Sequence, residues 1–260
     1  MNDREGRTEP LPRLNRLILV AGLGVVGVAS WVYVLSGAGL DMSAAAHMAK
    51  PADWSAGYLS VLFVMWWVMM VAMMLPSAMP MIMLFATINR KAAERAAPTV
   101  STLVFVGGYL AVWGGFSIAA VIAQWQLAMA RLLSPMMESS SLFFGGLLLL
   151  AAGIYQLTPL KDACLRHCRS PMAFIMSRWR PGPLGAFRMG LDHGAICLGC
   201  CWVLMSLLFY GGVMNFAWIA GLTVYVLVEK FAPFGDKIGR YAGGVLIIWG
   251  VWILWLASSR

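Results

Sequence analysis

Long apolar segments constrain the fold of this chain more than any other feature of its sequence. Seven such segments can be identified, at residues 17–35, 58–86, 100–130, 142–160, 194–213, 215–230 and 241–258. A helix needs about 20 apolar residues to cross a bilayer, and it satisfies its own backbone polar groups within the lipid. The sequence therefore predicts an all-α fold, a polytopic integral membrane bundle of about seven transmembrane helices.

The composition fits a membrane protein rather than a soluble domain. Hydrophobic residues make up 61% of the 260 residues. Charged residues make up 12%, which is about half the fraction in an average protein. We expect a polar cytoplasmic segment over residues 1–16, followed by one transmembrane helical domain over residues 17–260. The first apolar segment is longer than the core of a secretory signal peptide, so we interpret it as a retained anchor.

The distribution of lysine and arginine predicts the orientation of the helices. If the N-terminus lies in the cytoplasm, sixteen of these residues fall on the inner side, Lys161 and Lys230 among them, and three fall outside. Cytoplasmic loops of membrane proteins carry such an excess of positive charge. We therefore expect the N-terminus inside and the C-terminus outside. On this interpretation the net charge of +8 sets topology, and the sequence predicts no binding of nucleic acid.

The chain contains five cysteines, and all of them are expected near the cytoplasmic side. They are Cys164, Cys168, Cys197, Cys200 and Cys201. None falls in an outer loop, where a structural disulfide would form in an oxidising compartment. An odd number also leaves one cysteine unpaired. We therefore expect reduced thiols.

The fifth apolar segment contains the densest group of soft side chains, in the stretch HGAICLGCCWVLM at residues 193–205. At 100° per residue, the side chains of His193, Cys197, Cys200 and Cys201 project within an arc of about 100°. Thiolate and imidazole groups are suited to copper(I) or zinc. Buried cysteines also pack as small hydrophobic residues, which is the alternative. Asp192 could orient the His193 ring by a hydrogen bond.

A second group of candidate ligands lies in the stretch LTPLKDACLRHCRSP. Cys164 and Cys168 are four residues apart, so they share a face if the fourth segment continues as a helix, with His167 beside them. Two thiolates at this spacing can share a metal ion. Zinc-binding pairs usually have shorter spacers and a second pair elsewhere, so the pattern alone leaves the metal open.

Methionine is concentrated in the second apolar segment, which holds eight of the chain's 19 methionines between residues 65 and 83. Two stripes at helical spacing stand out: Met65, Met69 and Met73 in one, and Met79 and Met83 in the other. Thioethers bind copper(I), although methionine is also an adaptable packing residue. Pro76 and Pro80 lie in the same segment and predict a kink.

Isolated residues add two weaker candidates. His47 and Met48, in an outer segment, could meet a metal ion arriving from outside. Glu229 lies near the inner end of the sixth segment, where an acid is either functional or pairs with Lys230 at the membrane interface. The sequence shows no nucleophile triad, phosphate loop or dinucleotide fingerprint. It therefore gives no positive indication of an enzyme.

Three stretches, VMMVAMMLPSAMPM, YQLTPLKDACLRHCRSP and GCCWVLM, together resemble a bacterial family of predicted metal-binding integral membrane proteins, catalogued as a domain of unknown function. The resemblance covers about residues 58 to 258. It implies a multi-pass protein of the bacterial inner membrane that handles a metal ion, with copper favoured. It implies no established reaction.

These observations favour a membrane protein that binds a soft metal ion, most simply copper(I), and chaperones or translocates it. Zinc is the alternative metal, and the expected partners are the lipid bilayer, the metal ion and a protein that donates or accepts it. Two other functions stay open: a thiol redox protein cycling Cys164 with Cys168 or Cys200 with Cys201, and a structural membrane subunit. The methionines favour the metal, because thiol exchange does not use thioethers.

Overall fold

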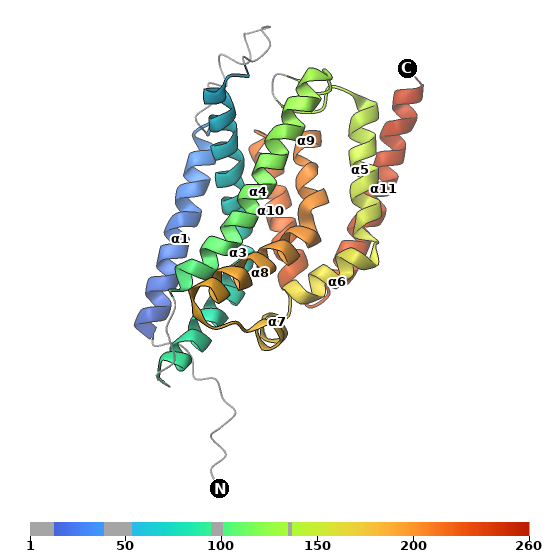
Figure 1. Ribbon diagram of the computed structural model, residues 1–260. Helices are drawn as coiled ribbons and strands as arrows, with labels where there is room; N and C mark the ends of the chain where they lie inside the picture. The colour runs from blue at the N-terminus through green and yellow to red at the C-terminus, as the bar shows by residue number, and fades with distance from the viewer. Residues whose placement is uncertain (1–12, 39–53, 95–100, 135–136, 260) are drawn as a thin grey trace.

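A computed structural model describes residues 13–38, 54–94, 101–134 and 137–259 (Figure 1). These residues form helices, and within them the β-structure is limited to an isolated bridge between Leu133 and Ser139. The all-α prediction is confirmed for this part of the chain. His47 and Met48 lie outside the described residues.

Most of the described helices are long and apolar. In chain order they are α1 (Arg13–Leu35), α3 (Ala56–Glu94), α4 (Thr102–Met129), α5 (Leu142–Gln156), α6 (Pro159–Cys168), α7 (Pro171–Arg178), α8 (Gly182–Ser206), α9 (Leu208–Gly211), α10 (Phe216–Phe231) and α11 (Gly235–Ser258). Five spans among the described residues are long and apolar enough to cross a membrane, namely those formed by α1, α3, α4, α8 with α9, and α11. The pair α5 and α6 provides a sixth span if it is counted as one. This indicates a membrane protein.

Helix α10 corresponds to the sixth of the predicted segments but is shorter than the other spans. Its 16 residues extend about 24 Å at 1.5 Å per residue, against a hydrocarbon core of about 30 Å. It follows α8 and α9 through Gly212, which has a φ of +96°, a value that favours glycine. Figure 1 shows α10 and α11 running in opposite directions along the bundle, whereas α8 crosses it obliquely before it meets α9.

The fourth segment does not continue as one straight helix, because α5 and α6 meet at an angle of 66°. The cause is local. Thr158 caps α6, its side chain accepting a hydrogen bond from the Lys161 amide, and Pro159 occupies the first turn. A threonine cap followed by proline is a typical helix start. As a result α6 turns from the lower end of α5 toward α8, against which it packs (Figure 1).

Helix α3 runs through both of its prolines as a single helix of 39 residues. Each proline lacks an N–H donor, which leaves a backbone carbonyl one turn earlier without its usual partner. Two hydroxyl groups bind a different carbonyl in this region, that of Met74: Ser77 Oγ and Tyr109 Oη both donate to it, at 2.8 and 3.1 Å. The predicted kink itself stays a prediction.

Glycine allows α4 and α8 to cross at close range. A Cβ atom added to Gly108 would collide with the carbonyl oxygen of Phe187, and one added to Gly190 would collide with that of Phe105. Close backbone approach at small residues is how transmembrane helices associate. This crossing holds the start of α8, and therefore the cysteines that follow it, against α4.

Candidate metal centre

The structure brings four of the five cysteines together between α6 and α8. Cys197, Cys200 and Cys201 are fully buried on α8, and the thiols of Cys200 and Cys201 each donate to the Cys197 carbonyl at 3.0 Å. Cys168, at the end of α6, interacts with the thiols of Cys197 and Cys200. We refer to these four residues as the thiol cluster. All five cysteines are described, and none forms a disulfide in the structure.

A methionine of α3 joins this cluster. The thiol of Cys201 lies 3.9 Å from the Sδ atom of Met74, a residue that belongs to neither predicted stripe. The stripe of Met65, Met69 and Met73 is buried in the core of the bundle. The pair Met79 and Met83 is half-buried. Helical periodicity predicts which methionines share a face of α3. It does not predict which of them contacts a cysteine, because that depends on how α3 packs against α8.

His193 lies one turn before Cys197 and is buried among aromatic rings. The ring centroids of Phe105, Tyr109 and Phe174 lie 6.2, 5.8 and 5.5 Å from that of His193. Within the described residues, neither ring nitrogen has a hydrogen-bond partner. Buried polar groups are nearly always hydrogen-bonded, so this imidazole has unused capacity to bind a ligand.

Asp192 does not form the hydrogen bond to the His193 ring that its position in the sequence allowed. Its carboxylate lies 3.5 Å from the Arg178 guanidinium and 3.9 Å from that of Arg180, while His193 has no hydrogen-bond partner. Adjacent residues on a helix project about 100° apart, so Asp192 faces the polar end of α7 while His193 faces the core.

The remaining two sequence candidates on α6 are placed differently from the thiol cluster. Cys164 is half-buried and packs on Gly199, where an added Cβ would lie 2.9 Å from the Cys164 sulfur. His167 is exposed, and its Nδ1 atom lies 2.8 Å from the Ala163 carbonyl. The structure therefore does not bring His167 into the buried cluster.

Lys230 of α10 reaches into the thiol cluster, which the sequence analysis did not anticipate. Its ammonium group is buried and donates to Cys197 Sγ and to Ser77 Oγ, both at 3.0 Å. The Tyr109 hydroxyl lies 3.3 Å from the same sulfur. Lys230 of α10 and Tyr109 of α4 thus both contact the Cys197 sulfur, and Ser77 of α3 holds the Lys230 ammonium group from the other side.

Glu229, the neighbour of Lys230, does not pair with it at the membrane interface, so that alternative was wrong. Its carboxylate accepts from Lys161 of α6 at 2.5 Å and from the Tyr225 hydroxyl at 3.1 Å, and both charged side chains are buried. Lys161 and Lys230 are therefore interior charges rather than loop charges. Without them the predicted inner side keeps fourteen basic residues against three on the predicted outer side, so the charge bias behind the predicted orientation remains.

The described residues contain no group of three or more histidine, cysteine, aspartate or glutamate side chains arranged to hold a metal ion. The arrangement instead combines thiols, the Met74 thioether and an ammonium group. The sulfur donors suit a soft cation such as copper(I), which binds thiolate and thioether and does not require hard oxygen ligands.

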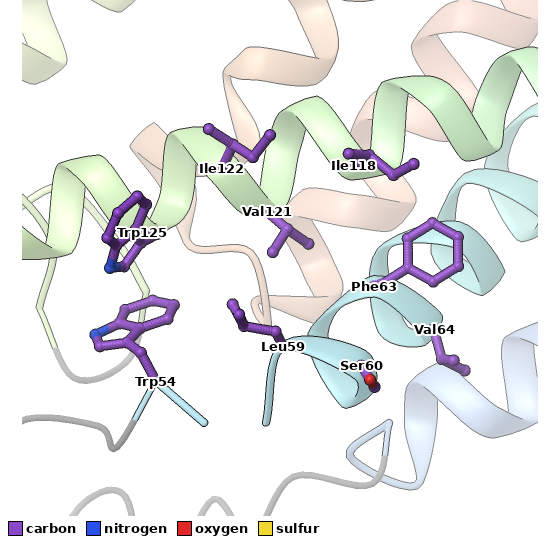
Figure 2. Close-up of a pocket in the computed structure, with 9 residues that line it drawn as sticks. All are labelled: Trp54, Leu59, Ser60, Phe63, Val64, Ile118, Val121, Ile122 and Trp125. Carbon is purple, nitrogen blue, oxygen red and sulfur yellow. The ribbon is translucent and has the colours of Figure 1, made fainter. Parts of the chain in front are cut away.

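A separate cavity of about 580 Å³ lies between the start of α3 and the end of α4. Its lining consists of Trp54, Leu59, Ser60, Phe63, Val64, Ile118, Val121, Ile122 and Trp125 (Figure 2). Figure 2 shows Trp54 and Trp125 together at one end of this space. The lining is apolar except for Ser60 and contains no sulfur, so the cavity offers no ligands to a soft metal ion.

The long apolar helices indicate a helical membrane protein, and buried cysteine and methionine side chains meet in its interior. Residues 63–253 match a protein family, PpoB2, that is described as a copper chaperone. This match covers most of the chain, and the chain belongs to that family. No curated protein and no solved structure matches it. The family supports the expectation of a copper-related function.

Proposed function

We propose that this protein is a membrane-embedded chaperone for copper(I), which it holds at the thiol cluster and passes along or across the bilayer. The observation that carries the proposal is the contact between Met74 of α3 and Cys201 of α8. It joins the methionine-rich helix to the cysteine-rich helix. Family membership supports copper as the cargo, and zinc is the alternative.

The two kinds of sulfur ligand suit different steps. A thioether is neutral and holds copper(I) weakly, whereas a thiolate binds it tightly. We assign the approach path to Met65, Met69, Met73, Met79 and Met83, and the terminal site to Cys164, Cys168, Cys197, Cys200 and Cys201 with His167 and His193. What supports this order is that the first methionine stripe is buried in the bundle and that Met74, next to Met73 in the chain, contacts Cys201. His167 is the weakest member, because it is exposed.

The first experiment measures copper(I) bound by purified, reduced protein that carries no metal-affinity tag. Replacing Cys197, Cys200 and Cys201 together by serine is expected to remove most of the bound copper, because serine oxygen is a hard donor. The readout is copper per protein after gel filtration of folded material. Parent-level copper in folded triple variant would contradict the proposal.

The matched comparison is Met69→Leu with Met73→Leu. Leucine is close to methionine in volume, so the packing cost should stay below about 1.5 kcal/mol. If these residues form the approach path, the variant loads copper more slowly but reaches the same final occupancy. Loading at the parent rate would assign these methionines to packing alone.

We further propose seven transmembrane helices in the bacterial inner membrane, with α10 as a short span, residues 1–16 in the cytoplasm and the C-terminus outside. The charge bias of fourteen to three supports this orientation. A reporter that is active only in the cytoplasm is expected to be silent when fused after Arg260 and active when fused at the N-terminus. A strong signal from the C-terminal fusion would reverse the orientation or change the number of spans.

A second candidate function, a thiol redox protein, is favoured by the proximity of cysteines on two helices. Cys168 of α6 interacts with both Cys197 and Cys200 of α8, so oxidation could join the two helices by a disulfide. Such a protein would lose two free thiols reversibly and would bind no stoichiometric copper(I) when reduced. Counting free thiols beside bound copper in the same sample separates the two functions.

A further inference from the structure

We infer that Lys230 sets the charge selectivity of the thiol cluster, favouring a soft monovalent cation over a divalent one. The inference rests on the proposed function, because it concerns the metal ion that the cluster accepts. It names a residue of α10 that contributes no metal ligand and acts through its positive charge.

The position of the Lys230 ammonium is fixed from two sides. It donates to Cys197 Sγ on α8 and to Ser77 Oγ on α3, each at 3.0 Å, and the side chain is buried. A lysine ammonium group has three donors and no acceptor, so it can donate to the serine and to the sulfur at once but cannot itself bind a cation. The arrangement keeps one positive charge in direct contact with a candidate ligand.

The buried acid next to it does not cancel this charge. Glu229 projects elsewhere on α10 and is paired with Lys161 at 2.5 Å, so that pair is neutral on its own. In the part of the chain that the structure describes, the side chains to which Lys230 donates are Ser77 and Cys197, so no carboxylate neutralises its charge at the cluster.

The positive charge of the ammonium group repels a metal ion that is bound at the cluster. The Coulomb energy between two charges is proportional to the charge of each, and it is large where water is excluded. A divalent ion at the cluster meets twice the repulsion that a monovalent ion meets at the same distance. Lys230 therefore penalises zinc(II) and copper(II) more than copper(I) or silver(I).

The test compares silver(I), a soft monovalent cation that avoids the redox chemistry of copper, with zinc(II) on full-length reduced protein in detergent. Competition titrations give the ratio of the two affinities for the parent and for Lys230→Met, Lys230→Gln and Lys230→Arg. We expect Lys230→Met and Lys230→Gln to shift the ratio toward zinc(II) by at least about tenfold. Lys230→Arg keeps the charge and is expected to keep the parent ratio.

The outcomes separate this inference from the proposed function. If the parent binds silver(I) at the cysteines but the ratio is unchanged in both neutral variants, Lys230 does not set selectivity and the inference is overturned. An equal shift in Lys230→Arg would assign the effect to packing and would also overturn it. If the parent binds no silver(I), or binds it undiminished without Cys197, Cys200 and Cys201, the proposed function itself fails. Lys230→Gln keeps a polar group near Ser77, so it provides the answer if Lys230→Met does not fold.

Discussion

Lys161→Met is expected to lower the free energy of unfolding by about 3–5 kcal/mol, because it leaves the Glu229 carboxylate buried without its cation. The two groups are 2.5 Å apart, and their side chains are 2% and 1% exposed. Tyr225 would remain as a hydrogen-bond donor to the carboxylate, but a hydroxyl carries no compensating charge. The change is measured as the unfolding midpoint of monodisperse protein in detergent.

Two further variants show whether burial of the charge is the cause. Lys161→Met combined with Glu229→Met removes both charges, and stability should recover most of the loss, since apolar replacement of a buried ion pair is often neutral. Asp162→Asn breaks the pair with Arg240, in which Arg240 is 62% exposed, and should change stability by less than about 1 kcal/mol. If Asp162→Asn and Lys161→Met lose equal stability, the buried ion pair contributes no more to the free energy of unfolding than the exposed one.

Gly108→Ala is expected to have the second large effect, a destabilisation of about 1–3 kcal/mol through overpacking. The added methyl group would collide with the Phe187 carbonyl oxygen and would lie 2.9 Å from the Leu191 amide nitrogen. Both are backbone atoms of α8, so they cannot rotate away as a flexible side chain could. Thermal unfolding in detergent, followed by loss of monodisperse protein, measures the change.

The neighbouring glycine supplies a matched control. An added Cβ atom at Gly107 meets nothing within 4 Å, although both glycines belong to α4. Gly107→Ala should therefore leave stability unchanged or raise it by up to about 1 kcal/mol, because alanine favours the helix. If the two variants lose stability equally, the close crossing of α4 and α8 does not explain the requirement for glycine.

The sequence predicted those features that depend on neighbours along the chain. Apolar length identified the segments now seen as α1, α3, α4, α8 and α11, since any helix of that length and composition is suited to lipid. The 3.6-residue period correctly placed Cys197, Cys200 and Cys201 on one buried face. The bend after α5 was missed, although Thr158 and Pro159 form a recognisable helix start.

The charges inside the bundle could not be predicted in the same way. Lys161 and Glu229 are 68 residues apart, and Lys230 and Ser77 are 153 apart, so their contacts depend on tertiary packing. Counting every lysine as a loop charge is sound on average and fails for a residue with a buried partner. The adjacent order of Glu229 and Lys230 suggested an ion pair at the interface, whereas helical geometry directs the two side chains to different helices.

The two opposite charges at the end of α10 have a consequence for how the protein is made. A charged side chain enters lipid at a cost in free energy, so α10 enters more easily where partners are already present. Glu229 pairs with Lys161, and Lys230 donates hydrogen bonds to Ser77 and Cys197. These three partner residues all precede α10 in the chain. During synthesis from the N-terminus, α3, α6 and α8 therefore leave the ribosome first, and the order of translation supplies each partner before the charge that needs it.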